Sequence, residues 1–335
     1  MRIEGLGKRR YWTAIMLSAA VAVVVLLLSP LVGPTKIDLG RVLANQAPDY
    51  QVFVMLRVPR VLLAMLAGGS LALAGAVFQS LLRDALATPY TLGVSSGASL
   101  GAVTAICLGW QRVGNLPAVW ASALCGAGLV MVLVLGIAGI GQRTSSFMLL
   151  LAGIAINSMC SAMILFVNSM AGFSQSFSIL RWMMGGIDAV DYSTLGWLLL
   201  LIAPAAGIVI WRGLAWNLMA VGEEWAAARG VSVKPLLLTG YIAASVLTAP
   251  VTAVTGPIGF VGLIVPHALR MRIGADHRVL LPCSFLLGAA FLAVCDAVGR
   301  VVLAPADLPV GIITALLGGP FFIWLLRTRW KGAWL

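Results

Sequence analysis

Residues 235–271 read PLLLTGYIAASVLTAPVTAVTGPIGFVGLIVPHALRM, an apolar stretch that is too long for one membrane-spanning helix. A bilayer core about 30 Å thick is crossed by roughly 20 helical residues. Pro250 and the pair Gly256-Pro257 interrupt the stretch, because proline lacks the N–H that a helix needs and Gly-Pro marks a turn. The stretch therefore predicts two spans, near 235–254 and 257–271, of which the second is short.

Similar apolar runs occupy most of the remaining chain. The 335 residues are 61% hydrophobic and 10% charged, with a mean hydropathy of +1.03, whereas soluble domains carry about a quarter charged residues. A water-soluble fold is therefore excluded. We expect an all-α polytopic membrane protein of about ten transmembrane helices, with residues 1–335 forming a single transmembrane domain. The other spans are predicted near 11–32, 58–82, 91–109, 117–141, 145–170, 192–212, 279–303 and 308–327.

The distribution of lysine and arginine favours dividing 235–271 into two spans. With ten spans and an inner N-terminus, 15 of the 22 basic residues fall on the inner side, in line with the positive-inside rule. If residues 235–254 and 257–271 formed one span, six of these basic residues would move outside and Arg300 would move inside. Only 10 of the 22 would then lie on the inner side. We therefore expect both termini in the cytoplasm. The net charge of +11 is interpreted as a topology signal and not as a nucleic-acid surface.

Two connecting segments carry candidate partner surfaces. Arg57 and Arg60 lie three apart at the outer start of the second span, against the charge rule, and either anchor lipid headgroups or receive an acidic partner. The longest inner loop, at about 213–234, contains residues 222–230, whose sequence predicts a short amphipathic helix stopped by glycine. This segment is either a solvated loop or a contact for a soluble partner protein.

Residues able to support catalysis or metal binding are few. His267 and His277 lie ten positions apart beside basic residues that would repel a cation, so we expect no metal site. None of the four lysines completes the phosphate-binding pattern G-x-x-x-x-G-K-[ST], so we do not expect an enzyme or an ATPase. Asp296 and Arg300 are four apart and are expected to pair on one face of the ninth span.

Taken in order, several short motifs resemble the FecCD family of permeases, which serves the uptake of ferric siderophores, haem and cobalamin. They extend from the second predicted span to the tenth, in the family's order. The motifs are residues 57–60 (RVPR), Gly75 with Gln79, 86–89 (LATP), 92–98 (LGVSSGA), 151–153 (LAG), 182–185 (WMMG), 259–263 (GFVGL) with Pro266-His267, 276–278 (DHR), Asp296 with Arg300, and 308–311 (LPVG).

The resemblance implies the fold of type II ABC importer permeases, in the bacterial inner membrane. It implies a homodimer embedded in lipid, with the transport path at its two-fold axis. It also implies two ATPase subunits on the inner side, which hold ATP and magnesium, and a periplasmic or lipid-anchored substrate-binding protein on the outer side. No cofactor is expected on this chain.

The resemblance also implies roles for particular residues. Carboxylates of the binding protein would be received by Arg57, Arg60 and Arg300. Contact with the ATPase would involve Gly222, Glu224, Ala227 and Gly230. The inner gate would comprise Asp84, Leu86, Thr144, Ser145 and Ser146, although this chain has Asp84-Ala85 where the family usually has Asn-Pro. Candidates for lining the path, or for interhelical hydrogen bonds, are Ser95, Ser96, Asn157 and Ser158.

The expected function is ATP-driven uptake of an iron chelate, either a ferric siderophore or haem, with cobalamin as the alternative within the family. A second class of function, an ion-coupled secondary transporter, would need ionisable residues near mid-span. The acidic residues instead fall at or near the ends of the predicted spans, which disfavours that class.

Overall fold

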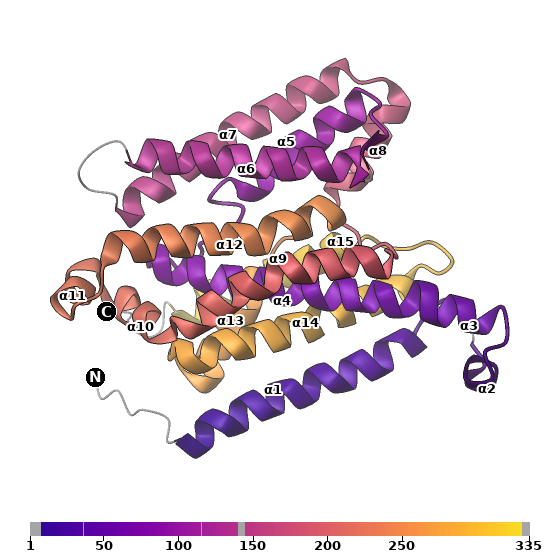
Figure 1. The fold of residues 1–335 in the computed structure, drawn as a ribbon, viewed down its shortest axis with the longest axis horizontal. Helices are drawn as coiled ribbons and strands as arrows, with labels where there is room; N and C mark the ends of the chain where they lie inside the picture. Colours follow the sequence, from indigo (N-terminus) through magenta and orange to yellow (C-terminus); the bar gives the residue numbers. More distant parts are fainter. Residues whose placement is uncertain (1–7, 36, 115, 140–144, 330–335) are drawn as a thin grey trace.

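The computed structural model describes residues 8–35, 37–114, 116–139 and 145–329. In this part of the chain, ten helices coincide with the predicted spans and run roughly side by side in one bundle (Figure 1). They are α1 (Lys8–Leu28), α4 (Val58–Leu82), α5 (Val94–Cys107), α6 (Ala118–Gly139), α7 (Ser146–Met170), α9 (Tyr192–Trp211), α12 (Val233–Thr255), α13 (Val261–Ile273), α14 (His277–Val302) and α15 (Val310–Arg329). The predicted division of residues 235–271 is confirmed, since α12 ends at Thr255 and α13 begins at Val261.

Shorter elements connect these helices. The connections contain a 3₁₀ turn (Ser29–Leu31), α2 (Leu39–Leu43), α3 (Asp49–Gln51), a π-helical turn (Val52–Arg57), the antiparallel pair β1 (Arg112–Val113) and β2 (Leu116–Pro117), α8 (Phe173–Met183), α10 (Gly213–Val221) and α11 (Glu223–Ala228). The sequence analysis did not predict α8 or α10. Both are too short to be recognised as spans, and α8 has several serines among its apolar residues.

Seven helical segments of the described chain are long and apolar enough to cross a membrane. They are Arg10–Leu31, Asp49–Leu82, Ala118–Gly139, Ser146–Met170, Tyr192–Trp211, Val233–Thr255 and His277–Val302. The helices α5 and α13 are shorter, with 14 and 13 residues, and the apolar part of α15 is Val310–Leu325. Short helices leave irregular backbone at membrane depth, and such backbone is tolerated where neighbouring protein covers it. The prediction of an all-α polytopic membrane protein is confirmed.

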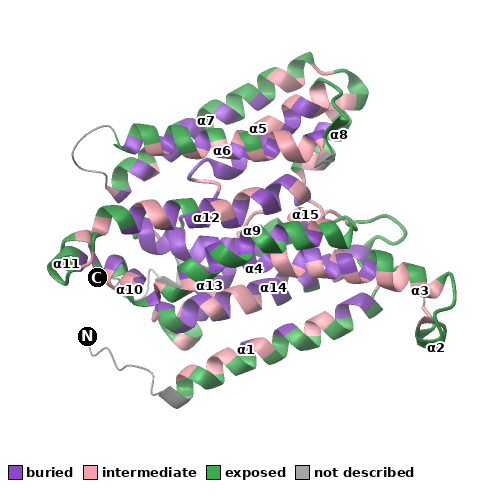
Figure 2. Cartoon of the chain, in the orientation of Figure 1, coloured by how far each residue is buried: buried purple, intermediate pink, exposed green. Residues whose placement is uncertain are grey.

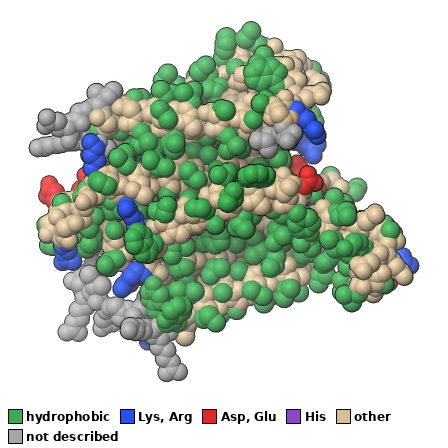
Figure 3. Space-filling view, viewed as in Figure 1, with side chains coloured by type: hydrophobic (Ala, Val, Ile, Leu, Met, Phe, Trp, Pro, Cys, Tyr) green, Lys and Arg blue, Asp and Glu red, His purple; other side chains and the backbone are tan. Residues whose placement is uncertain are grey.

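Helix α4 forms the centre of the bundle. In its most apolar window 83% of the residues are buried, against 22% for α1, and Figure 2 shows this difference along the two helices. The helices α12, α13 and α14 pack around α4. Apolar side chains cover most of the outward surface in Figure 3, which suits a bundle whose solvent is lipid.

Glycine allows two of these neighbours to approach α4 closely. A Cβ atom at Gly75 would lie 2.0 Å from the carbonyl oxygen of Gly262 in α13, and one at Gly68 would lie 2.2 Å from that of Gly288 in α14. Such distances leave no room for any side chain. The small residues of α4 therefore serve close backbone packing.

Candidate functional site

Polar side chains gather at the two ends of the bundle. The α11 end contains α10, α11 and the first turns of α7 and α14, and the α2 end contains α2, α3 and the connection between α14 and α15 (Figure 1). The sequence analysis placed the α11 end on the inner side and the α2 end on the outer side. The candidate residues fall into one group at each end.

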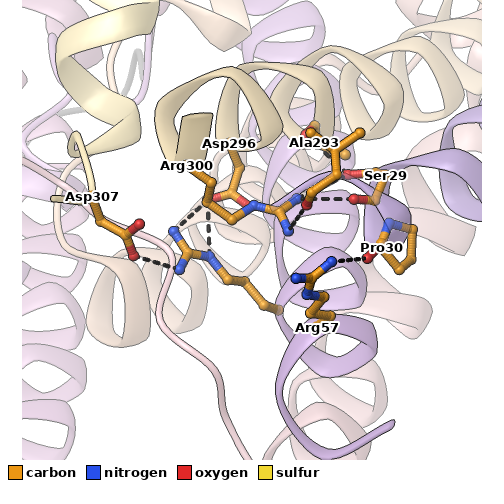
Figure 4. A network of polar contacts seen from close by, with 9 residues as sticks. Ser29, Pro30, Arg57, Ala293, Asp296, Arg300 and Asp307 are labelled. Atoms are coloured by element: carbon orange, nitrogen blue, oxygen red, sulfur yellow. Dashed lines mark hydrogen bonds and ion pairs between the residues drawn. The ribbon is translucent and has the colours of Figure 1, made fainter. Parts of the chain in front are cut away.

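Arg57, at the α2 end, is 6% exposed. Its Nη1 donates to the carbonyl oxygen of Pro30 at 3.2 Å, and its Nη2 donates to the hydroxyl of Thr35 at 3.0 Å. The guanidinium thus satisfies backbone and side-chain acceptors of the segment that follows α1 (Figure 4). These hydrogen bonds hold that segment against the start of α4.

Arg60 joins α4 to α14 through carboxylates. Its Nε and Nη2 donate to Oδ1 of Asp296 at 3.2 and 3.0 Å, and its Nη1 donates to Oδ2 of Asp307 at 2.7 Å. The Asp296 side chain is 3% exposed and that of Asp307 is 48% exposed. The cluster therefore extends from the buried Asp296 to the half-exposed Asp307, both of which are labelled in Figure 4.

Arg300 completes this cluster. Its Nε lies 3.1 Å from Oδ2 of Asp296; this is an ion-pair distance, although the N–H is not aligned for a hydrogen bond. Its Nη1 donates to the carbonyl oxygen of Val32 at 2.8 Å, and Nη2 donates to that of Ser29 at 3.2 Å. The predicted pairing of Asp296 with Arg300 is confirmed.

Of the three arginines to which the resemblance gives a docking role, Arg57 and Arg300 are buried, at 6% and 2% exposed. Carbonyl oxygens of the segment after α1 accept hydrogen bonds from both guanidinium groups, and Arg300 also pairs with Asp296 one turn earlier in its own helix. A buried guanidinium is tolerated only with such partners. Arg60 keeps 17% of its side chain exposed. The docking role implied for the three arginines stays a prediction, which this geometry supports best for Arg60.

A cavity of about 540 Å³ opens beside the cluster, between α8, α12 and the α14–α15 connection. Its lining includes Arg60, Phe177, Arg181, Asp188 and Asp307. Both signs of charge and an aromatic ring therefore line this opening. The sequence analysis missed it, because its walls come from five separate segments.

At the α11 end, the helix predicted within residues 222–230 is present as α11. It stops as expected: Gly230 has φ +82°, a left-handed conformation that suits glycine, and Val231 N–H donates to the carbonyl oxygen of Ala226 at 3.0 Å. Gly222 separates α10 from α11. The exposed residues of α11 include Glu224, Trp225 and Ala227.

Two of the expected gate residues, Ser145 and Ser146, begin α7. The Ser145 hydroxyl accepts a hydrogen bond from Met148 N–H at 3.3 Å and caps the helix. The N–H and hydroxyl of Ser146 both donate to Oε1 of Glu223, at 3.0 and 2.6 Å. Thr144 lies outside the described residues. The sequence analysis named Ser146 but missed Glu223, whose partner is 77 positions away.

The turn after α4 holds the other gate candidates, Asp84 and Leu86. Arg83 ends α4 with φ +53°, and Oδ1 of Asp84 accepts a hydrogen bond from Leu86 N–H at 2.9 Å. Asparagine forms the same kind of turn. Asp84 therefore makes the side-chain contact that an asparagine would make here, and Leu86 is 43% exposed.

A polar cluster that the sequence analysis missed surrounds His277 at the start of α14. The Ser80 hydroxyl contacts the Nε2 of His277, and Asn217 Oδ1 lies 2.7 Å from its Nδ1. Asn217 Nδ2 donates to Asp276 at 2.8 Å. Burial alone would raise the pKa of Asp276, but hydrogen bonds from Arg278 and Asn217 outweigh it and lower the pKa to about 2. Within the described chain, no three His, Cys, Asp or Glu side chains gather as metal ligands.

The four candidates for lining the path divide into two pairs. Ser95 and Ser96 are 0% and 7% exposed on α5, which packs against α6 and α7; a role for them in lining the path stays a prediction. Asn157 is half-buried and Ser158 is exposed on α7. The Ser158 hydroxyl donates to the carbonyl oxygen of Ile154 at 3.0 Å, in its own helix.

Comparison with known proteins gives a consistent result. The model of the FecCD transport family matches residues 21–328. The hemin transport system permease protein HmuU of Yersinia pestis is 38% identical over 283 residues, which are 84% of each chain. The vitamin B12 import system permease protein BtuC of Klebsiella pneumoniae is 39% identical over 320 residues, which are 92% of each chain.

One solved structure extends the likeness to the fold. It is an ABC transporter assigned to the metal-chelate type, captured in an inward-facing conformation. The TM-score is 0.83 at 29% sequence identity, and the match covers 94% of this chain and 99% of the other.

Proposed function

This chain belongs to the FecCD transport family and is the permease subunit of an ABC importer, and we propose that it carries a metal chelate inward across the bacterial inner membrane. The observation that carries the proposal is the family match over residues 21–328. The chain is a transport protein, and ATP is hydrolysed on a separate subunit. In the proposed orientation, the α11 end and both termini face the cytoplasm.

The chelate is drawn from the cargoes of the relatives. One relative is named for hemin and the other for vitamin B12, at 38% and 39% identity. An iron chelate, as a siderophore complex or haem, and cobalamin are therefore equal candidates. Haem and cobalamin share a metal held in a large macrocycle, so a wide path is common to both.

The proposed assembly has two copies of this chain, two ATPase subunits and a substrate-binding protein. The support for a second copy is the outward face of α7, where Leu151, Met159 and Phe166 are among the exposed apolar residues. The support for an ATPase contact is α11, a short helix at the bundle end whose residues Trp225 and Ala227 are exposed. The binding protein would dock at the α2 end, over Arg60 and the adjoining cavity.

Reconstitution tests the proposal. The permease is inserted into proteoliposomes with the ATPase and binding protein from the same genome, and uptake of labelled haem, a ferric siderophore and cobalamin is measured with and without internal ATP. We expect ATP-dependent accumulation of one chelate and no ATP hydrolysis by the permease alone. Accumulation that follows a proton or sodium gradient without ATP would contradict the proposal.

A further inference from the structure

The contact between Glu223 and Ser146 links three elements at the α11 end. Glu223 is the first residue of α11, and Ser146 is the first residue of α7. The Ser146 hydroxyl is also 2.6 Å from the carbonyl oxygen of Leu81, in the last turn of α4. Ser146 is 2% exposed and Glu223 is half-buried, so the contact lies at the edge of the packed interior.

The chemistry of the helix ends favours this contact. The first N–H groups of an α-helix have no partner in the helix, and neither do its last carbonyl groups. Ser146 N–H is such a donor at the start of α7, and the carbonyl of Leu81 is such an acceptor at the end of α4. A carboxylate at the start of a helix is further favoured by the helix dipole. Glu223 therefore provides an anion for the N-terminus of the 25-residue helix α7.

The Ser146 hydroxyl has one proton but two acceptors at the same distance of 2.6 Å, Glu223 Oε1 and the carbonyl oxygen of Leu81. A hydroxyl donates only one hydrogen bond at a time. If α11 moves and Glu223 withdraws, the hydroxyl keeps a full partner at Leu81, whereas the Ser146 N–H loses its acceptor. The contact can thus break while leaving only that N–H unpaired.

We propose that Glu223 is a positioning residue that transmits movement of α11 to the first turn of α7 through Ser146. The inference rests on the proposed function, in which α11 contacts the ATPase and α7 faces the second copy of the chain. It adds a defined connection between them: a carboxylate on α11 holds the N-terminus of α7, and Ser146 joins both to the end of α4. Arg83, which ends α4, also lies near the start of α11. Its Nη1 is 3.8 Å from where a Cβ atom of Gly222, the residue before α11, would be.

The first test uses the permease alone in lipid nanodiscs and follows hydrogen exchange of the amides in the first turn of α7. We expect faster exchange there in Glu223→Ala than in the parent, because the Ser146 N–H loses its acceptor. The matched control is Ser161→Ala, on the same helix, whose hydroxyl donates to the carbonyl oxygen of Asn157. Unchanged exchange in Glu223→Ala would overturn the proposed contact, and this arm needs neither ATPase nor cargo.

The second test measures chelate transported per ATP hydrolysed in the reconstituted importer. Coupling between sites typically corresponds to a 5-fold change or more, so we expect Glu223→Ala and Ser146→Ala each to lower this ratio roughly fivefold. The double variant should be no worse than Glu223→Ala, since both act through one contact. Ser146→Thr, which keeps the hydroxyl and N–H, should restore the ratio.

The transmission role of Glu223 would be overturned if both single variants transported as much chelate per ATP as the parent. Additive losses of this ratio in the double variant would overturn it as well. A parent importer that carries no chelate would instead refute the proposed cargo. Because the exchange measurement reports on the contact independently, the two failures are distinguishable.

Discussion

Arg60 in α4 and Asp296 in α14, 236 positions apart, form an ion pair with an N–O distance of 3.0 Å in the interior of the α2 end. Asp296 also lies 3.1 Å from Arg300, so two guanidinium groups share one buried carboxylate. The pair joins α4 to α14, which pack against each other, at the end where the chain is proposed to meet its binding protein. The contribution of this ion pair to stability can be compared with that of the pair between Arg60 and Asp307, whose carboxylate is 48% exposed.

Asp296→Asn is expected to destabilise the protein strongly. It leaves Arg60 and Arg300 without their shared buried charge, and breaking a buried pair typically costs about 3–5 kcal/mol. Asp307→Asn removes the exposed partner of Arg60 and should cost about 0–1 kcal/mol. Thermal unfolding midpoints in the same detergent compare the two. Equal midpoints for both variants would show that the buried pair adds nothing.

Gly75→Ala is expected to loosen the crossing of α4 and α13. The new methyl carbon would lie only 2.0 Å from the carbonyl oxygen of Gly262. Overpacking of this kind typically costs about 1–3 kcal/mol of stability. Gly128→Ala is the control, since nothing lies within 4 Å of a Cβ there. We expect a lower unfolding midpoint for Gly75→Ala only. A parental midpoint for it would mean that the crossing adjusts freely.

The stability of the α11 end should fall in acid because of Asp276. Its lowered pKa of about 2 means that the ionised form stabilises the folded chain. This contribution to stability is complete at pH values above about 3.9, the pKa of aspartate in the unfolded chain. It is lost as the pH falls toward about 2. Unfolding midpoints from pH 5 to 2 should fall more steeply for the parent than for Asp276→Asn. Parallel curves would contradict the assignment.

Ala227→Trp is expected to uncouple transport without unfolding the permease. Ala227 is exposed on α11, so the permease itself accommodates the ring, whereas an overfilled contact with the ATPase costs about 1–3 kcal/mol. Copurification with the ATPase and ATP-driven uptake should both decrease. Ala44→Trp, exposed at the opposite end, should leave copurification unchanged. Parental copurification and uptake for Ala227→Trp would remove α11 from the contact.

Arg60 and Arg57 should differ in their effect on the binding protein. Arg60→Ala should slow its association with the permease in nanodiscs, and most at low salt, because exposed charges steer encounter and are screened by ions. Arg57→Ala should leave the association rate unchanged and lower the unfolding midpoint, since its partners lie within the chain. If both leave the rate unchanged at low salt, neither arginine docks the binding protein.

Local signals in the sequence determined the fold class and most of the helices. Apolar runs of span length, Pro250 with Gly256-Pro257, and Gly230 each act within a few residues, so their effects can be read without knowing the neighbours. The division of residues 235–271 and the stop of α11 were predicted on this basis and are confirmed. The same local patterns gave no sign of α8, which is short and mixed in polarity.

Only the tertiary structure decided which charged and polar groups meet. Arg57 and Arg300 were named for docking a partner protein, yet both are buried, and segments 22 to 271 positions away provide hydrogen-bond acceptors for them. Glu223 finds Ser146 across 77 positions. Whether a charge is buried depends on the partners that reach it in space, because desolvation is offset only by specific oxygen and nitrogen atoms at hydrogen-bond distance. Periodicity and composition set helix length and depth in the membrane, but they contain no information on those distances.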